Sequence, residues 1–392
     1  MTLGREAMVG VVGAGAMGAG IAQVAALQGH QVVLGDESAA AVERAKDGLA
    51  KAMAREVEKG RLARAEADGA IARVRYAGAQ PGEFASCGLV IEAIVERLDA
   101  KRQLFTLLEQ VVSPGAVLAT NTSSLAVAAL AGACARPGRV IGIHFFNPAP
   151  VMPLVEIIPS LATDAAVLAE ARALISRWGK TGVVAADTPG FIVNRIARPF
   201  YGESLRILEE GIADCATIDW ALRELAGFKM GPFELMDFIG NDVNFAVTCS
   251  IFDGMFHDPR YRPTLTQRRL VESGRLGRKA KQGYYDYRDG ASVPEPRKDE
   301  GVGHAICDRV LAMLINEAVD ALYLRVASAA DIEVAMTKGV NYPKGLLAWG
   351  DEIGAGGILA RLDALQAEYG DDRYRPSRLL RQLAKYSRRI LA

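Results

Sequence analysis

Cysteine is scarce in this chain of 392 residues, and its five cysteines are scattered without a CxxC pair. An odd and widely spaced set predicts neither a disulfide framework nor a metal site, and it favours a reducing, cytoplasmic setting. Net charge is absent too, because 46 basic side chains balance 46 acidic ones. A neutral chain has no bulk attraction for nucleic acid or for an anionic membrane surface.

Long apolar runs are also missing. No uncharged stretch reaches the ~20 residues that span a bilayer, and the N-terminus lacks the successive regions of a signal peptide. The sequence therefore predicts no membrane partner. Half of the residues are nevertheless hydrophobic, which is enough for sizeable cores in two or three domains of ~100–200 residues each.

Short apolar runs alternate with helical stretches at the start of the chain. Helices are expected from Ala16, over Ala40–Lys59, from Leu98 and over Asp164–Trp178. This alternation predicts a parallel sheet with right-handed crossovers. The expected strands are Met8–Val12, Gln31–Leu34, Leu89–Ala93, Val117–Thr120, Val140–His144, Leu154–Ile158 and, less regular, Val183–Ala185.

The second half of the chain is mostly helical and contains an internal repeat. The segment Asp258–Pro263 recurs as Asp371–Pro376, and further matches run back to Ile192–Arg195 and Ile306–Arg309 at a nearly constant offset. The Gly- and Pro-containing segment Gly290–Gly303 between the copies is expected to be a linker. We therefore predict an α/β domain over residues 1–187, followed by two repeated all-α domains over residues 188–289 and 303–392, the second copy being degenerate.

The first expected strand leads directly into the motif Gly13-Ala14-Gly15-Ala16-Met17-Gly18. Gly13 permits a tight turn, Gly15 lets the backbone approach a pyrophosphate, and Gly18 allows the helix to pack closely on the strand. The helix N-terminus adds unpaired N–H groups and partial positive charge. This pattern is typical of a dinucleotide-binding Rossmann domain.

Asp36 follows the second expected strand, where a carboxylate can accept hydrogen bonds from the ribose hydroxyls. An acid there repels a 2′-phosphate, so we expect NAD rather than NADP; the alternative is that Asp36 only caps a helix. The segments Ala93–Glu96 and Thr120–Ser124 end two further strands, at the sheet edge where such domains bind ligands. Ser and Thr at these positions are often helix caps, so that alternative also stays open.

His144 ends a strand, and Glu156 lies inside the apolar run Leu154–Ile158. A carboxylate in such a run needs a partner, and a strand-end imidazole is a suitable one. Oxidising a secondary alcohol requires a base for the hydroxyl proton, and a carboxylate on the second ring nitrogen orients the imidazole and raises its basicity. A purely structural His–Glu pair is the alternative.

With these residues in view, the chain resembles the 3-hydroxyacyl-CoA dehydrogenase family. The resemblance runs from residue 8 to ~287 in family order, and it implies reversible, NAD-dependent oxidation of an (S)-3-hydroxyacyl-CoA. The matching pieces are VVGAGAMGAGIAQ from Val11, EAIVERLDAK from Glu92, LATNTSSL from Leu118, GIHFFNPAPVMPLVEII from Gly142, DTPGFIVNRI from Asp187 and GFKMGPFELMDFIGND from Gly227.

The resemblance implies a role for each matching residue. His144 is the general base, Glu156 orients it, and Ser123 and Asn194 hold the substrate oxygen. Lys51, Arg55 and Lys59 share a helix face that either meets the CoA phosphates or is merely solvated, and we expect a CoA contact only from Lys59. The expected cofactor-binding residues are Gly13, Gly15, Ala16, Met17, Gly18, Asp36, Glu37, Ala93, Glu96, Lys101, Asn121, Ser123 and Asn147.

The chain departs from single-unit family members by continuing past Tyr287 into the second helical copy, where Asp308 stands in place of Asn194. That copy is expected to be structural, which leaves open both a homodimer and a monomer whose second copy replaces the dimer partner. The wording around Gly227 is most similar to dehydrogenases of aromatic-acid catabolism, which act on 3-hydroxyadipyl-CoA or 3-hydroxybutyryl-CoA. A gulonate-type dehydrogenase of a free hydroxy acid and a non-catalytic NAD-binding protein are the alternatives.

Overall fold

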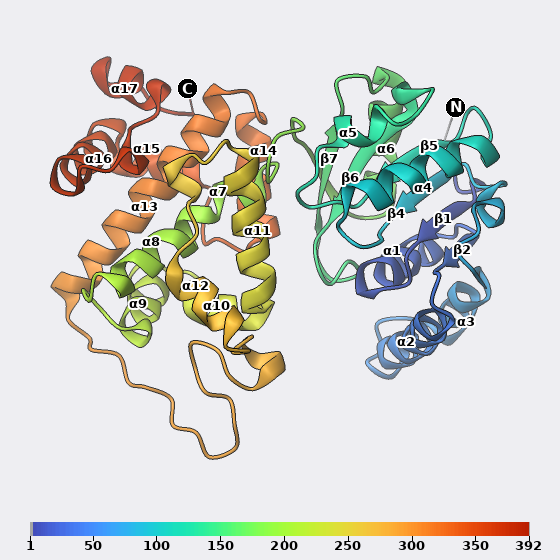
Figure 1. Cartoon of the computed structure of the whole chain (residues 1–392), viewed down its shortest axis with the longest axis horizontal. Helices are drawn as coiled ribbons and strands as arrows, with labels where there is room; N and C mark the ends of the chain where they lie inside the picture. Colours follow the sequence, from blue (N-terminus) through green and yellow to red (C-terminus); the bar gives the residue numbers. More distant parts are fainter. Residues whose placement is uncertain (1–2, 392) are drawn as a thin grey trace. The chain divides into compact units, whose positions relative to one another are not determined.

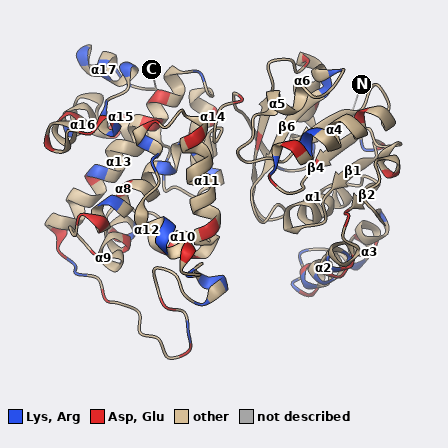
Figure 2. Ribbon diagram, in the orientation of Figure 1, with Lys and Arg blue, Asp and Glu red and all other residues tan. Residues whose placement is uncertain are grey.

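A computed structural model describes residues 3–391 of the chain. Contacts divide the chain into two compact units, one ending at Thr188 and the other beginning at Pro189 (Figure 1). Basic and acidic residues alternate along the ribbons of both units and are not gathered by sign (Figure 2). None of the helices within residues 3–391 combines the length and the apolar character needed to cross a bilayer.

The first unit is built on one eight-stranded sheet in the order β3-β2-β1-β4-β5-β6-β7-β8. Most of its strands are buried along their whole length, as expected for strands covered by helices. The strands are β1 Val9–Val12, β2 Val32–Gly35, β3 Val74–Ala77, β4 Leu89–Glu92, β5 Val117–Thr120, β6 Val140–Phe145, β7 Leu154–Pro159 and β8 Thr181–Val184.

One pair of strands runs against the rest. The sheet is parallel from β3 through β6 and again between β7 and β8, but β6 and β7 are antiparallel. The expectation of a parallel sheet is therefore wrong at this pair. Its cause is the short connection over residues 146–153, because a parallel crossover needs a dozen or more residues.

The helices expected in the first unit are all present, and two short ones add to them. Strand residues such as Val11, Ile91 and Ile143 share a core with Ile21 of α1 and Leu174 of α6. The sequence pattern does not predict α3 or β3, because β3 is a half-exposed edge strand with an arginine and a tyrosine. The helices are α1 Ala16–Leu27, α2 Ala39–Glu58, α3 Arg64–Ala72, α4 Leu98–Val111, α5 Val127–Ala131 and α6 Ala165–Arg177.

The second unit is helical and is organised around its longest helix, α13 (Glu300–Tyr323), which contacts α8, α15, α16 and α17. A helix that is apolar on nearly every side is expected at such a central position. The other helices are α7 Val193–Ile196, α8 Arg198–Glu209, α9 Cys215–Trp220, α10 Pro232–Ile239, α11 Asn241–Gly254, α12 Leu265–Glu272, α14 Ala329–Gly339, α15 Leu346–Ile353, α16 Ala355–Tyr369 and α17 Arg378–Lys385, with a π-helical turn at Ala221–Leu225.

The expected linker Gly290–Gly303 is shorter than predicted, because α13 already begins at Glu300. The Asp299 side chain caps this helix by accepting a hydrogen bond from the Val302 N–H at 3.1 Å. The remaining segment is tied to the helices at one point, where the Arg297 N–H donates to the Thr217 hydroxyl at 2.9 Å.

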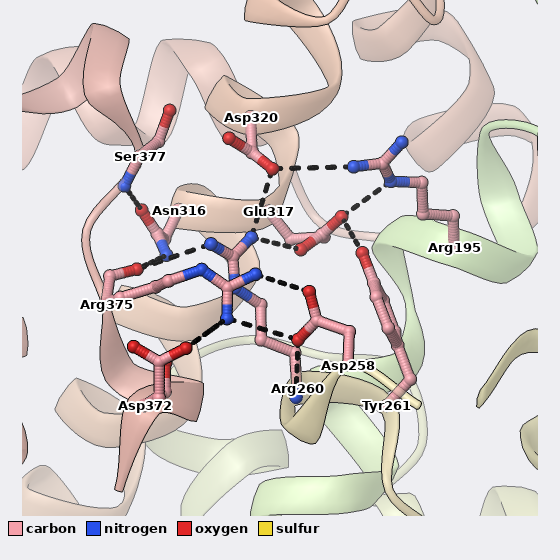
Figure 3. Close-up of polar contacts among 10 residues, drawn as sticks. All are labelled: Arg195, Asp258, Arg260, Tyr261, Asn316, Glu317, Asp320, Asp372, Arg375 and Ser377. Carbon is pink, nitrogen blue, oxygen red and sulfur yellow. Dashed lines mark hydrogen bonds and ion pairs between the residues drawn. The ribbon is translucent and has the colours of Figure 1, made fainter. Parts of the chain in front are cut away.

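A buried carboxylate of α13 gathers three side chains from the N-terminal half of the helical unit (Figure 3). Glu317 accepts hydrogen bonds from Arg195 Nε at 2.7 Å, Arg260 Nη1 at 3.1 Å and the Tyr261 hydroxyl at 2.5 Å. Its side chain is 1% exposed. Burying such a charge is tolerated only because paired cations and hydrogen bonds replace the lost water.

The reverse arrangement exists at Glu203 of α8. This carboxylate accepts from Arg309 Nε at 3.0 Å and from the Tyr374 hydroxyl at 3.1 Å, and Arg373 lies within 3.6 Å. Each of these residues stands at the spacing of the sequence repeat from its counterpart around Glu317. Residues before the linker thus hold the acid of α13, while residues after it hold the acid of α8.

Candidate active site

The glycine loop has the shape that a bound pyrophosphate requires. Gly13 has φ +108, and a Cβ there would come within 2.4 Å of the Ala93 carbonyl oxygen. A Cβ on Gly18 would come within 1.7 Å of the Gly13 carbonyl oxygen. Apart from its own chain neighbours, none of residues 3–391 has an atom within 4 Å of the place where a Cβ of Gly15 would stand, so this side of the loop is open to a ligand. Gly15 is the N-cap of α1 and provides no side-chain cap, which leaves the first N–H groups of the helix available for phosphate oxygens.

Asp36 lies directly beside this loop. Its Oδ2 accepts a hydrogen bond from the Ala14 N–H at 2.7 Å, and its Oδ1 accepts one from the Ser38 N–H at 2.8 Å. The cap of α2 is Ser38, whose hydroxyl accepts from the Ala41 N–H. Asp36 is thus joined to the glycine loop and is not itself the helix cap, while its neighbour Glu37 is exposed.

A buried lysine organises the next loop. Lys101 Nζ lies 2.6 Å from Glu92 Oε1 and 2.9 Å from Glu96 Oε2, and its side chain is 1% exposed. The Thr120 hydroxyl donates to Glu92 Oε2 at 2.7 Å. Lys101 therefore holds the ends of β4 and β5 together from a buried position. Glu96, and not Lys101, reaches the surface of the loop.

Glu96 connects that lysine to the Ser/Thr loop after β5. Its Oε1 accepts from the Thr122 hydroxyl at 2.5 Å, the Ser123 N–H at 3.0 Å and the Ser124 hydroxyl at 3.0 Å. Burial alone would raise the pKa of Glu96, but the Lys101 charge and these hydrogen bonds outweigh it and lower the pKa. The charged form of Glu96 thus holds the backbone of Ser123 in place.

The His144–Glu156 pair is formed by the antiparallel strands β6 and β7, which place the two residues opposite each other. His144 Nδ1 lies 2.7 Å from Glu156 Oε2, and the Glu156 side chain is 0% exposed. The Asn121 side chain accepts a hydrogen bond from the Phe145 N–H at 2.8 Å, which ties the β5 loop to this strand end. The Phe146 ring packs at 4.7 Å from the imidazole.

Two acidic residues of this region are not predicted from the sequence. Glu92 ends an apolar strand and is completely buried, so the argument applied to Glu156 could have found it. Asp187 accepts from the N–H groups of Val127 and Ala128 at 2.8 and 2.7 Å, which caps α5 just after the Ser/Thr loop. Nothing in the sequence around Asp187 indicates a partner sixty residues earlier.

The remaining predicted residues lie at the loops of the first unit, except one. Asn194 belongs to α7 of the helical unit, and its carbonyl accepts from Arg198 Nε at 2.8 Å. The others are the helix residues Ala16 and Met17, the half-buried Ala93 after β4, the exposed Asn147 after β6, and the exposed Lys59 that caps the C-terminus of α2.

A second histidine of this unit is buried just before β2. His30 is 3% exposed. Its Nε2 accepts from Trp178 Nε1 at 3.0 Å, and its Nδ1 contacts the Ala7 carbonyl at 2.9 Å. A Trp side chain distant in sequence supplies this partner, which a local pattern cannot indicate.

Comparisons with known proteins identify the family of the chain. The family model described as 3-hydroxyacyl-CoA dehydrogenase, NAD binding domain, matches residues 8–188. The model described as 3-hydroxyacyl-CoA dehydrogenase, C-terminal domain, matches residues 190–287 and 306–389. Together they account for most of the chain.

Individual relatives give the same result. A 3-hydroxyadipyl-CoA dehydrogenase of Escherichia coli K12 is 41% identical over 96% of this chain and 97% of its own length. A 3-hydroxybutyryl-CoA dehydrogenase of Bradyrhizobium diazoefficiens is 43% identical over 73% of this chain and 97% of its own. A crystal structure of 3-hydroxybutyryl-CoA dehydrogenase from Escherichia coli K12 has a TM-score of 0.91 and 39% identity, and covers 97% of this chain and 99% of that one.

The open glycine loop and the adjoining Asp36 fit an NAD molecule, and the matching NAD-binding model identifies the same cofactor. An α/β nucleotide-binding unit followed by a helical region is the architecture expected from the sequence. The chain belongs to the 3-hydroxyacyl-CoA dehydrogenase family and is an NAD-dependent dehydrogenase.

Proposed function

We propose that this enzyme catalyses the reversible oxidation of an (S)-3-hydroxyacyl-CoA to the 3-oxoacyl-CoA, with His144 as the general base. The observation that carries the proposal is the buried pair in which Glu156 contacts His144 Nδ1 at 2.7 Å. A carboxylate on one ring nitrogen fixes the tautomer and raises the basicity of the imidazole, which is what a general base for the hydroxyl proton requires.

Bound NAD supplies the acceptor for the hydride that leaves C3 of the substrate. His144 removes the proton of the 3-hydroxyl group through Nε2 as the carbonyl forms, and it returns that proton in the reverse direction. Glu156 stabilises the imidazolium that results, because a buried negative charge interacts strongly with a positive one in a medium of low dielectric constant. Ser123 and Asn194 hold the substrate oxygen, in agreement with the resemblance.

The loops around the glycine motif hold the cofactor in this proposal. Asp36 accepts hydrogen bonds from the adenosine ribose, and Glu96, Asn121 and Asn147 contact the nicotinamide half. Lys101 acts as a positioning residue, because its buried ammonium group reaches Glu96 and Glu92 but not the surface of the loop. Lys59 meets a phosphate of CoA, a role supported by its exposed position at the end of α2.

Short or adipyl-type acyl chains are the proposed substrates, since relatives are named for 3-hydroxybutyryl-CoA and 3-hydroxyadipyl-CoA. Both carry the same reacting group, a secondary alcohol at C3 of a CoA thioester. They differ at the far end of the acyl chain, where only the adipyl group bears a carboxylate.

The helical unit is proposed to consist of two repeated domains, residues 188–289 and 303–392. Asp219 accepts from the N–H groups of Phe233 and Glu234, and Glu333 accepts from those of Leu347 and Ala348 at the corresponding positions. The exchanged contacts of Glu203 and Glu317 have the reciprocity of an isologous dimer interface. The second domain therefore takes the place of a partner subunit within one chain.

Absorbance at the NADH band tests the proposed reaction. Purified enzyme should oxidise NADH with acetoacetyl-CoA and leave it unchanged with free acetoacetate. A His144→Asn variant should lose about 10²–10⁴-fold in turnover while it still binds NAD. Turnover of the free acid without turnover of the thioester would overturn the proposed substrate class, and an active His144→Asn enzyme would overturn the proposed base.

A further inference from the structure

Arg198 is a buried cation without an acidic partner. Arg198 is 6% exposed, yet no carboxylate of residues 3–391 forms an ion pair with its guanidinium group. Its Nε donates to the Asn194 carbonyl at 2.8 Å and its Nη1 to the Thr248 hydroxyl at 3.1 Å, both neutral acceptors. Its guanidinium lies over the Tyr201 ring, 4.8 Å from the centroid.

This arrangement sets Arg198 apart from the other buried arginines of the described chain, each of which lies within 4 Å of a glutamate. Those residues are Arg139, Arg195, Arg206, Arg260, Arg309 and Arg373. An uncompensated buried charge costs several kcal/mol. A carboxylate that arrives with the substrate would remove this cost.

A second buried polar group beside Arg198 also lacks a partner. The Tyr342 side chain is buried, and its hydroxyl has no hydrogen-bond partner among the described residues. Burial raises the pKa of Tyr342 well above its usual value, Tyr201 raises it further, and the nearby Arg198 charge opposes the shift. The Arg198 guanidinium lies over the Tyr201 ring, and its charge also acts on Tyr342, with no acid paired to Arg198. Guanidinium and phenol groups are both donors that a carboxylate can accept from.

A mostly apolar cavity adjoins this group on the side of Tyr342, while Arg198 lines a second cavity of about 10 Å³. The first cavity has a volume of about 60 Å³, and Tyr342 forms part of its wall. The other wall residues are Phe200, Phe228, Lys229, Met230, Leu235, Val340 and Asn341. The Tyr342 ring packs 5.8 Å from that of Phe200 and 4.9 Å from that of Phe228. Apolar walls beside buried donors suit an acyl chain that ends in a carboxylate.

We propose that Arg198, assisted by the Tyr342 hydroxyl, binds the terminal carboxylate of a dicarboxylic 3-hydroxyacyl chain. The inference rests on the proposed function, in which Asn194 holds the oxygen on C3. Arg198 begins the helix that follows Asn194, and its Nε donates to the Asn194 carbonyl at 2.8 Å, so the cation stands beside the residue that holds that oxygen. Tyr342 belongs to the second helical domain, so that domain supplies a specificity residue.

Two substrates of equal length separate recognition of the charge from recognition of the chain. The kcat/KM of the enzyme is measured with 3-hydroxyadipyl-CoA and with 3-hydroxyhexanoyl-CoA, and the ratio is compared among variants. Arg198→Met should lower the ratio at least tenfold by loss on the adipyl substrate, with the hexanoyl value within threefold of wild type. Tyr342→Phe should lower the ratio less, because it removes one neutral donor. The ratio does not depend on how much of a variant is folded.

Arg206→Met is the matched control, because Arg206 lies on the same helix and is buried but has Glu203 as its partner. Its ratio should equal that of wild type. Equal losses on both substrates in Arg198→Met, or a wild-type enzyme that prefers the hexanoyl substrate, would overturn the inference while the proposed function stands. A wild-type enzyme that oxidises neither thioester would overturn the proposed function itself.

Discussion

The pairing of His144 with Glu156 depends on strand register. In an antiparallel pair, residues directly opposite bring their Cβ atoms within about 4.5–5.5 Å, which suits an imidazole–carboxylate hydrogen bond. Glu156 is completely buried. Its negative charge therefore interacts with the His144 imidazole with little screening by water. Replacing Glu156 with a neutral residue of the same size therefore tests how much its charge contributes.

Glu156→Gln should lower kcat by about 10²–10⁴-fold, the range for disabling a general base or the carboxylate that orients it. The amide keeps the size of the carboxylate but removes the charge that stabilises the imidazolium. Stopped-flow measurement of NADH oxidation with acetoacetyl-CoA reports the step, and the Kd for NADH serves as the control and should stay within threefold of wild type. A kcat within threefold of wild type would show that Glu156 is only structural.

For single residues, the sequence indicates the catalytic histidine and its acid, but it does not indicate most of the buried contacts around them. His144 and Glu156 stand out because one ends a strand and the other interrupts an apolar run. Lys101 does not stand out as buried, because its partner Glu92 lies nine residues away across a loop and a helix turn. Asp187 and His30 are fixed by residues far along the chain, and local patterns carry no information on such contacts.

At the scale of elements, the β1–loop–α1 junction gives a sharp test, because its glycines are required for different reasons. A Cβ on Gly15 meets no protein atom, whereas a Cβ on Gly18 collides with the Gly13 backbone. Gly15→Ala should therefore keep the thermal midpoint of wild type and raise the Kd for NAD at least tenfold. Gly18→Ala should lower the midpoint, since the clash forces α1 away from β1.

Fluorescence titration with NADH and thermal unfolding measure the two effects separately. Gly48→Ala is a control inside α2, where a Cβ also meets nothing within 4 Å. It should leave the Kd unchanged and should raise the midpoint slightly, because Ala is favoured over Gly in a helix interior by about 0.5–1 kcal/mol. A Gly15→Ala protein that binds NADH as tightly as wild type would contradict the proposed approach of the pyrophosphate to this residue.

The order of helices and strands is predictable where patterns are strong, and strand direction is predictable from connection length. The helices α1, α2, α4 and α6 lie where the sequence places them. The antiparallel pairing of β7 was open to prediction too, because residues 146–153 are too few for a crossover helix. The edge strand β3 has no clear pattern, since only its first residue is buried.

For the whole molecule, the repeat is evident in the sequence, but the exchange of contacts is not. A constant offset predicts two copies of one domain, and it does not say whether Glu317 is held by its own copy or by the other one. The structure shows that Arg195 and Arg260 hold it (Figure 3). The two halves of the helical unit are therefore coupled through charge pairs that neither half contains alone.

This coupling has a defined pH dependence. Burial alone would raise the pKa of Glu317, but Arg195 and Arg260 outweigh burial and lower the pKa to about 2. The unfolded chain has a glutamate pKa of about 4.3. Because the folded-state pKa is the lower one, the charged carboxylate stabilises the fold above about pH 4.3, and this stabilisation is lost as the pH falls towards 2.

Glu317→Gln should destabilise the enzyme by about 3–5 kcal/mol at pH 7, because it leaves two buried arginines without their shared anion. The difference from wild type should shrink between about pH 4.3 and pH 2, where the wild-type carboxylate also becomes neutral. Urea unfolding over this pH range measures both effects. Glu368→Gln, at an exposed position of α16, makes the same change in net charge and should leave stability within about 0.5 kcal/mol of wild type. A constant difference at all pH values would mean that Glu317 stabilises the two halves by shape rather than by charge.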